Sequence, residues 1–415
     1  AAAAPPAAPT TPTANGEYAQ FATRTSQSSY AATTANPTPG QFPGANTNPL
    51  GHTEAQQFDS RFGTMLRQTG PNGLSTSWTY DGFGRKTSET RADGSKSYWE
   101  YVYCSSAAAG ACPANVQGVA PYYYIRSGNL TSAGAQLGPI SRTYYDNLSR
   151  PIRNQVQVVT GPTSFTWMTQ DTQYDSWGRV SGKTQDYLSD STGHIADQTP
   201  QWTRFKYDIL SRVSREESQD SSATNTANQQ SGVYVKTMAY NGLQNTVVDS
   251  KGQSTTSQKN VAGYPASITD AQGNTIVYTH DALGNQTRVD ASGVVSTATF
   301  DLRGRKVASS DPQMGQWAYK YNALGELRLQ QDAKGQLVQV AYDNLGRQTE
   351  RREADLVSNW AYDTHNSACA LAPNTAKGKL ARATTSTGYE RIHCYDSLGR
   401  EISQRVSMDG KVFWS

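Results

Sequence analysis

The chain has 415 residues and a formal net charge of +3, and only 36% of its residues are hydrophobic. Such polarity is common in disordered chains, but these are poor in aromatic residues, and this chain contains 24 Tyr, 8 Trp and 9 Phe. We therefore expect a folded, strand-rich protein with thin layers. The 37 basic and 34 acidic residues form no dense basic block, which argues against a nucleic-acid partner. No apolar run approaches the roughly 20 residues of a membrane span.

The first 50 residues differ in composition from the rest of the chain. Residues 1–50 are rich in Ala, Pro and Thr and contain few aliphatic residues, which predicts a disordered linker. The opening stretch has neither the basic region nor the apolar core of an intact signal peptide, and it lacks an initiator Met. We therefore expect a mature or truncated product. Residues 51–415 are predicted to form a second region with insertions near 101–140 and 218–232.

A short phrase that begins with an aromatic residue and Asp recurs through this second region. Weaker copies start at Phe58, Asn260 and Tyr362, and strong copies start at Tyr80, Tyr145, Tyr174, Tyr207, Tyr240, His280, Phe300, Tyr321, Tyr342 and Tyr395. Between residues 240 and 362 the starts are 20 to 21 residues apart, which indicates a repeated structural unit. Most strong copies have Tyr first, Asp second, an apolar fourth residue, Gly fifth and Arg sixth.

Each preferred position of the phrase has a physical explanation. Asp or Asn can bond the backbone two residues on and open a turn, and Gly allows a positive φ within it. We predict that the aromatic residue ends a strand and that the apolar fourth residue folds back as a plug. The Arg is predicted to bond carbonyls or a carboxylate of a neighbouring copy. The predicted structural residues are Tyr80, Asp81, Gly84, Arg85, Tyr174, Asp175, Gly178, Arg179, Tyr342, Asp343, Leu345, Gly346, Arg347, Tyr395, Asp396, Leu398, Gly399 and Arg400.

The residues around the phrase alternate with a period of two. Trp317, Tyr319 and Tyr321, for example, would share one face of a strand. About ten residues after each phrase comes a second turn sequence, such as DAQGN at 270 and DAKGQ at 332. One unit is therefore predicted to be strand, turn, strand, turn. Successive units would form an all-β antiparallel meander without substantial helix.

The strings YDGFGRK, YDSWGRV, YDNLGRQTE and YDSLGRE resemble the YD repeats of the Rhs family. That family includes bacterial polymorphic toxins, the BC component of insecticidal toxin complexes, wall-associated proteins and the repeat region of teneurins. The resemblance covers residues of about 58–415. It implies a spiralling ribbon of antiparallel β-hairpins that forms a shell or cocoon around a C-terminal toxic domain. It also implies a location outside the cell or at the cell surface.

The chain departs from the family pattern in one respect. Neither a DPxGxxGG-type core motif nor a following variable toxin is present in the sequence. We therefore expect a fragment of a longer member, part of the shell wall without its payload. The expected partner is the remainder of the same polypeptide or its toxin payload.

Four cysteines form two local pairs, Cys104 with Cys112 and Cys369 with Cys394. The sequence leaves open whether each pair is a disulfide or two buried thiols. Neither spacing matches a zinc site. His365 and His393 lie near the second pair, again at no recognised metal spacing. No metal or other cofactor is predicted.

The residue patterns favour a protein without catalysis. No nucleophile-elbow, phosphate-loop or zinc-protease string is present, and the repeated aspartates belong to turns. The first interpretation is a structural scaffold, part of a toxin-enclosing shell. The alternative is a cell-surface adhesion or carbohydrate-binding protein, whose ligand surface would include Tyr122, Tyr123 and Tyr124. An enzyme on a β-propeller or β-helix is disfavoured because the turns are too uniform.

Overall fold

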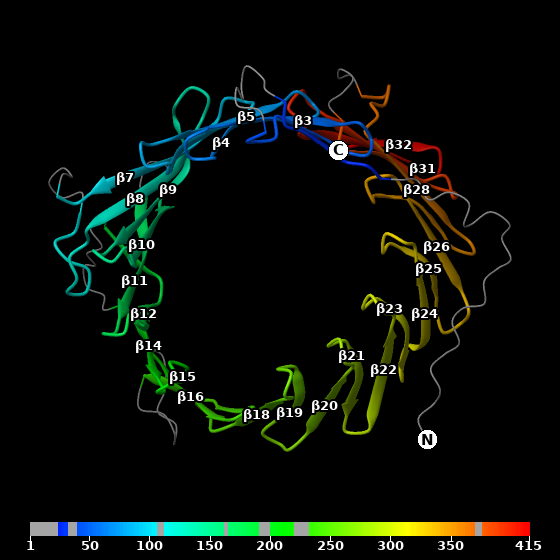
Figure 1. The fold of residues 1–415 in the computed structure, drawn as a ribbon. Helices are drawn as coiled ribbons and strands as arrows, with labels where there is room; N and C mark the ends of the chain where they lie inside the picture. The colour runs from blue at the N-terminus through cyan, green and yellow to red at the C-terminus, as the bar shows by residue number, and fades with distance from the viewer. Residues whose placement is uncertain are drawn as a thin grey trace. The chain divides into compact units, whose positions relative to one another are not determined.

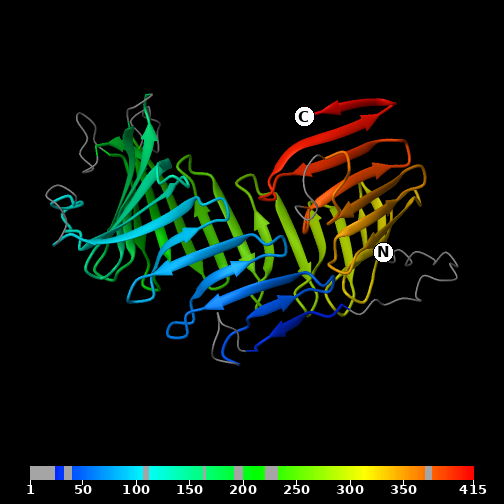
Figure 2. The same cartoon turned by 90° about the horizontal axis from the view of Figure 1, so that it is seen from above.

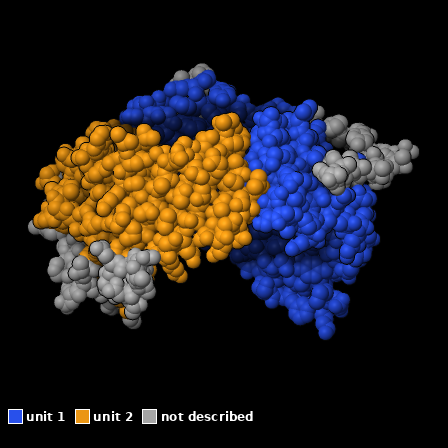
Figure 3. Space-filling model, turned by 90° about the horizontal axis from the view of Figure 1, so that it is seen from below, with its two compact units in different colours: residues 1–78, 91–93, 278–415 blue, residues 79–90, 94–277 orange. Residues whose placement is uncertain are grey.

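The computed structural model describes residues 24–31, 40–105, 112–161, 165–190, 200–219, 232–369 and 376–415. Within these ranges the chain forms 32 β-strands and no helix. The chain divides into two compact units, which Figure 3 colours separately: residues 1–78, 91–93 and 278–415 form unit 1, and residues 79–90 and 94–277 form unit 2. The prediction of an all-β array of antiparallel hairpins without substantial helix is confirmed.

Unit 2 contains strands β6 to β19, which follow one another from cyan to green in Figure 1. Their bounds are β6 Lys86–Thr90, β7 Lys96–Tyr103, β8 Tyr123–Leu130, β9 Gln136–Tyr145, β10 Pro151–Val159, β11 Phe165–Tyr174, β12 Val180–Thr184, β13 Tyr187–Ser189, β14 Trp202–Tyr207, β15 Val213–Gln219, β16 Val233–Asn241, β17 Gln244–Val248, β18 Ser254–Lys259 and β19 Pro265–Thr269. Consecutive strands pair antiparallel, except that β12 and β13 both pair with β11, and β14 then pairs with β12.

Unit 1 contains β1 to β4 and β21 to β32, and the second group runs in chain order towards the red C-terminal end in Figure 2. Strands β5 (Ser75–Tyr80) and β20 (Thr275–His280) contain residues of both units. The other bounds are β1 Gln27–Ser29, β2 Ala45–Thr47, β3 Thr53–Phe58, β4 Met65–Thr69, β21 Gln286–Ala291, β22 Val294–Phe300, β23 Lys306–Asp311, β24 Gly315–Tyr321, β25 Leu327–Gln331, β26 Leu337–Tyr342, β27 Gln348–Arg352, β28 Val357–Tyr362, β29 Leu380–Thr385, β30 Glu390–Tyr395, β31 Glu401–Met408 and β32 Lys411–Trp414.

The range predicted to be a linker contains two strands. β1 pairs antiparallel with β2, and β2 pairs with β3, so the described part of residues 1–50 belongs to the ribbon. The sequence did not indicate these strands because each has only three residues, QSS and ANT, with no aliphatic alternation. Backbone pairing and polar side-chain contacts, such as that from the Ser28 hydroxyl to Asn46 Oδ1 at 2.7 Å, define them. Residues 1–23 and 32–39 lie outside the described residues.

The insertion predicted near 101–140 contains parts of three long strands where the structure describes it. β7, β8 and β9 have eight to ten residues, longer than the strands of the regular repeats. The connection between β7 and β8 places Val116 against Tyr124, Tyr144 and Ile152, which form a fully buried cluster. Unit 2 therefore has a hydrophobic core at this point. Most of the second insertion, residues 220–231, lies outside the described residues.

Candidate functional site

Most YD phrases with Asp in second position form a five-residue turn held by that Asp. In the 342–347 copy, Asp343 Oδ1 accepts hydrogen bonds from the amides of Leu345 (2.8 Å) and Arg347 (3.0 Å). The guanidinium Nε of Arg347 donates to Asp343 Oδ2 at 2.7 Å. The Asp343 amide donates to the Arg347 carbonyl, and Gly346, at φ +80°, donates to the Asp343 carbonyl. We call this closed set of contacts the clasp.

The clasp recurs along both units. The same aspartate and arginine contacts join Asp81 with Arg85, Asp146 with Arg150, Asp175 with Arg179, Asp208 with Arg212, Asp301 with Arg305 and Asp396 with Arg400. Where Ser replaces Gly, Ser149 and Ser211 take the same left-handed conformation, at φ +60° and +62°. The ion pair inside one turn was not predicted, although every strong copy with Arg sixth has Asp second.

The leading tyrosines connect each turn to the one before it. Seven of the hydroxyls donate to a backbone carbonyl of the preceding repeat, as Tyr342 does to Leu327 at 3.0 Å. The same bond joins Tyr174 to Pro151, Tyr207 to Val180, Tyr240 to Val213, Tyr321 to Lys306, Tyr362 to Gln348 and Tyr395 to Leu380. We call this series the tyrosine ladder. It occurs in both units and fixes these seven repeats on their neighbours.

The clasp arginines cover the rings of the ladder. The guanidinium carbon lies 4.2 to 5.0 Å from the centroid of the next tyrosine, a cation–π geometry, in Arg150–Tyr174, Arg179–Tyr207, Arg212–Tyr240, Arg305–Tyr321 and Arg347–Tyr362. The predicted bonds to a neighbouring copy also occur. Arg305 donates to the Asn322 carbonyl at 2.9 Å, and Arg347 forms an ion pair with Asp363. One arginine therefore binds groups of its own turn and of the next turn.

The apolar fourth residue does not form the expected plug in several copies. Phe83 and Trp177 are each 81% exposed, whereas Leu345 and Leu398 are half-buried. The reason lies in the turn geometry, because the backbone amide at this position donates to the Asp side chain and the residue lies at the apex of the hairpin. Its side chain therefore extends beyond the strands.

Clasp formation lowers the pKa of the aspartates. Burial alone would raise the pKa of Asp343, but the hydrogen bonds from the Arg347 backbone and side chain outweigh it and leave the pKa below its ordinary value. At Asp301 the side chain of Arg305 is the largest cause of the lowering. The Arg61 side chain likewise lowers the pKa of Asp59 to about 2. The carboxylates are therefore charged in the folded protein.

The lowered pKa values predict that the fold loses stability in acid. A carboxylate whose pKa is lower in the folded than in the unfolded chain stabilises the fold fully above its unfolded pKa of about 4. This contribution disappears as the pH falls through the folded pKa. We expect thermal unfolding, followed by circular dichroism, to have a constant midpoint above about pH 5 and a steep fall below about pH 4. A midpoint unchanged down to about pH 2 would contradict the role of the clasps.

The three tyrosines of the predicted ligand surface differ in exposure. Tyr124 is only 7% exposed and belongs to the core, so it cannot contact a ligand. Tyr122, just before β8, is 54% exposed, and its ring meets those of Tyr103 and Tyr123 edge-on. Tyr123 also stacks on Tyr145 with ring centroids 4.7 Å apart. The surface that remains is an aromatic cluster centred on Tyr122.

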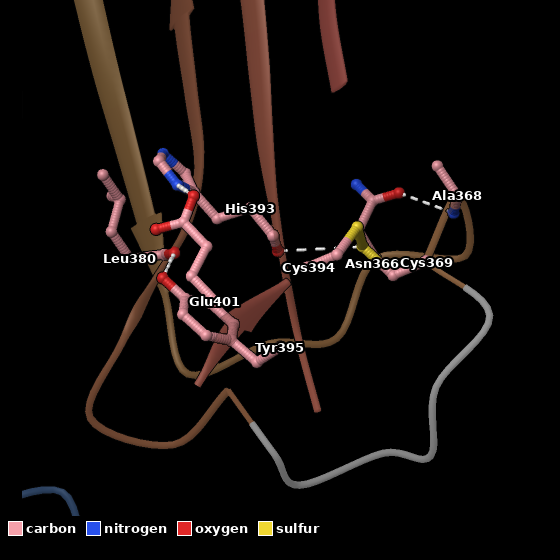
Figure 4. Close-up of a disulfide and its surroundings, with 8 residues drawn as sticks. All are labelled: Asn366, Ala368, Cys369, Leu380, His393, Cys394, Tyr395 and Glu401. Atoms are coloured by element: carbon pink, nitrogen blue, oxygen red, sulfur yellow. Dashed lines mark hydrogen bonds and ion pairs between the residues drawn. A yellow bond between two sulfur atoms is a disulfide. The ribbon is translucent and has the colours of Figure 1, made fainter. Parts of the chain in front are cut away.

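Both cysteine pairs are disulfides in the structure, Cys104–Cys112 and Cys369–Cys394. Figure 4 shows the second, whose Cys394 belongs to β30. Nearby, His393 Nδ1 lies 3.0 Å from Glu401 Oε1. With both sulfur atoms bonded to each other, they are not metal ligands. No group of three or more His, Cys, Asp and Glu side chains in the described residues is arranged to hold a metal.

Loss of the Cys369–Cys394 bond is expected to destabilise unit 1. The bond joins residues 25 positions apart, and cross-linking a loop of that size contributes roughly 3 to 4 kcal/mol in the chain-entropy model. The double variant Cys369→Ser/Cys394→Ser should therefore melt below the parent in a thermal scan. Cys104→Ser/Cys112→Ser, which opens a loop of separation 8, is the matched comparison with a smaller expected loss. Equal melting of the parent and the first variant would contradict the prediction.

A buried ion pair in unit 2 was not predicted from the sequence. Arg153 on β10 faces Asp171 on β11, and their side chains are 5% and 0% exposed. The guanidinium binds both carboxylate oxygens, at 2.6 and 2.7 Å. The Tyr187 hydroxyl and the Gln117 side-chain amide donate to the same carboxylate at 3.0 and 3.1 Å. The loop that carries Gln117 is thereby tied to the sheet.

The sequence and the fold were compared with known proteins. The RHS Repeat family model matches residues 60–96 and 260–295. No curated protein matches the sequence. The described part of the chain contains no helix able to span a bilayer.

Two crystal structures share the fold at low sequence identity. One contains TcdB2-TccC3 and Cdc42 (TM-score 0.59, 11% identity), and the other TcdB2-TccC3 without its hypervariable C-terminal region (TM-score 0.55, 10% identity). Each likeness covers 89% of this chain and 27% of the other, so the chain spans about a quarter of their length. The predicted fold class, a spiralling ribbon of hairpins, is confirmed. The matched stretches, the repeat spacing and the shared fold together show that the chain contains Rhs/YD repeats.

Proposed function

We propose that the chain is a non-enzymatic scaffold, part of an Rhs-type shell that encloses and delivers a toxic C-terminal domain. The observation that carries this proposal is the tyrosine ladder with its clasps. The recurring Asp, Arg and Tyr side chains bind one another or the neighbouring backbone, as Asp343, Arg347 and Tyr362 do. Their chemistry holds hairpins at a fixed spacing, which is what the wall of a container requires.

The comparisons support the same proposal. The similar TcdB2-TccC3 chains are about three times as long as this one, and one is described by the removal of a hypervariable C-terminal region. By analogy, the partner of this chain is the remainder of a longer polypeptide or its payload. The two disulfides support a location outside the cytosol, secreted or at the cell surface.

Two measurements test the scaffold proposal. Sequencing the DNA that flanks the coding segment should reveal further YD units, a DPxG-type core motif and a variable tail. The full product of that gene, purified from its own cells, should then protect its C-terminal domain from protease until the shell is denatured. A C-terminal domain that is digested as fast in the folded as in the denatured protein would overturn the proposal.

Glycan binding at the cell surface is a second candidate function. The observation that favours it is the aromatic cluster, in which Tyr122 and Tyr103 are 54% and 41% exposed. Tyrosine rings can stack on sugar rings while their hydroxyls bond sugar oxygens. The test is co-sedimentation with chitin or cellulose. Tyr122→Ala should abolish any binding, and Tyr234→Ala, a change at another exposed tyrosine, should not. Equal sedimentation of both variants would overturn this candidate.

A further inference from the structure

One repeat of unit 1 departs from the phrase at two coupled positions. In the copy YNALGEL, Asn322 replaces the usual Asp and Glu326 replaces the usual Arg. The turn itself is retained, because Asn322 Oδ1 accepts from the amides of Leu324 (3.0 Å) and Glu326 (2.9 Å). Asn322 Nδ2 also donates to Glu326 Oε2 at 2.6 Å. In this turn a hydrogen bond from the neutral Asn322 to the Glu326 carboxylate replaces the internal ion pair, and the negative charge of Glu326 is not balanced within the turn.

The cation that neutralises Glu326 comes from the other end of the chain. Arg24 Nη1 donates to Glu326 Oε1 at 2.7 Å and Nη2 donates to Oε2 at 3.0 Å, a two-pronged contact between residues 302 positions apart. Arg24 Nη2 also donates to the Asp343 carbonyl of the next repeat at 2.8 Å. The side chains are only 21% and 15% exposed, so the contact is partly shielded from water. Such bidentate pairs are directional as well as strong.

The next repeat leaves room for this contact. A Cβ atom on Gly346 would lie 2.9 Å from Glu326 Oε1 and 3.5 Å from Arg24 Nη1. Glycine at this position therefore permits both the left-handed turn and the approach of the guanidinium. We call Asn322, Glu326, the Asp343 carbonyl and Gly346 the Glu326 socket.

We infer that the Glu326 socket is the docking site for the N-terminal segment and fixes where β1 to β3 lie on the later repeats of unit 1. The two exchanges have a joint consequence. An Arg at position 326 would repel Arg24, and an Asp at position 322 would pair with the new arginine at 326 instead of leaving a carboxylate for Arg24. One other N-terminal residue reaches the same run of repeats: Asn72 donates to the Lys377 carbonyl at 2.9 Å.

These contacts differ in how well they can select one repeat among the similar ones. Asn72 donates a single hydrogen bond from its side-chain amide to a backbone carbonyl, a group that every residue has. Arg24 meets a side chain that occurs in the sixth position of only one strong copy. A guanidinium fork also requires a carboxylate at the right angle. The Arg24–Glu326 pair is therefore the contact that selects one position among similar repeats. The inference does not depend on the proposed payload.

The test restores the usual phrase and measures the N-terminal strands. In Asn322→Asp/Glu326→Arg the turn keeps an internal clasp of the usual kind, so hydrogen exchange of amides 323–327 should stay slow. Amides of β1 and β2 should exchange at least about tenfold faster, since docking no longer protects them. Unchanged exchange in β1 and β2 would overturn the inference.

A second set of variants leaves the repeats untouched. Arg24→Gln removes the cation alone and should accelerate exchange in β1 and β2 to the same degree. Arg61→Gln is the matched control, because Arg61 is 76% exposed in its side chain and its contacts are local, an ion pair with Asp59 and a cation–π contact with Phe62. The charge-exchanged pair Arg24→Glu/Glu326→Arg should return exchange towards the parent rate. Equal effects of the Arg24 and Arg61 variants would overturn the inference.

Discussion

Replacing Asp171 with Asn is expected to destabilise the β10–β13 part of unit 2 by about 3–5 kcal/mol. The substitution leaves the Arg153 guanidinium without its counter-charge, and only 5% of that side chain is exposed. Removing one partner of a buried pair is costly because the remaining charge has been taken out of water. The large effect follows from this uncompensated charge more than from the loss of one attractive contact.

The measurement is hydrogen exchange read locally, since a long repeat array need not unfold in one step. Protection of the amides in β10, β11 and β13 should fall in Asp171→Asn, together with that of residues 114–119. The latter respond because Gln117 donates to Asp171. Glu100→Gln is the matched control, since the Glu100–Arg126 pair is exposed and such pairs contribute less than about 1 kcal/mol.

A double variant separates the buried charge from general damage to the core. Replacing both residues, as Arg153→Met/Asp171→Leu, removes the unpaired charge and should recover a large part of the lost stability. A double variant less stable than Asp171→Asn would show that the hydrogen bonds of the pair, and not its charge balance, hold the strands. Equal stability of Asp171→Asn and Glu100→Gln would contradict the prediction outright.

The turns could be predicted from sequence because their chemistry is local. Asp343, Gly346 and Arg347 lie within five residues, and each has a preference that a single turn type explains. The repetition at 20 to 21 residues then predicts a hairpin array. The tyrosine hydroxyl bond was not predicted, because its acceptor is a backbone carbonyl whose place depends on how successive hairpins pair.

The exposed turn residues show a limit of hydrophobicity as a guide. Phe83 and Trp177 were expected inside because large apolar side chains are usually buried. The clasp, however, fixes the backbone at the apex of the hairpin before packing can act on the side chain. Burial at this position therefore depends on what lies beyond the hairpin, as the half-buried Leu345 shows. The sequence of one repeat contains no information on that neighbour.

The Arg24–Glu326 contact could not be predicted from the sequence, because its two residues are 302 positions apart. The exchange of Asp for Asn and Arg for Glu was visible in the sequence and looked like ordinary variation of the phrase. Only the structure places a cation from 302 positions away at the altered copy. The buried pair Arg153–Asp171 was not predictable for a related reason. Its two strands belong to one hairpin, but polar residues occupy both faces of these strands, so the sequence does not show which of them are buried.

Replacing Gly346 with Val is expected to damage the fold more than the same replacement at Gly325. Gly346 lies at φ +80°, a conformation that costs a β-branched residue about 1–3 kcal/mol. Its new Cβ would also lie 2.9 Å from Glu326 Oε1, so the Arg24–Glu326 pair must move. The strain and the lost contact act on the same repeat, and both should lower the protection of β26, β27 and β1 in hydrogen exchange.

Gly325→Val separates the two causes. Gly325 has φ +91° but open space around it, so this variant carries the backbone strain without the steric conflict. We expect Gly325→Val to weaken protection near its own turn by about 1–3 kcal/mol and to leave the contact between Arg24 and Glu326 in place. Gly346→Val should add faster exchange in β1. If both variants affect β1 equally, the space at Gly346 has no part in docking. If neither variant weakens its own turn, the clasp does not require the left-handed glycine.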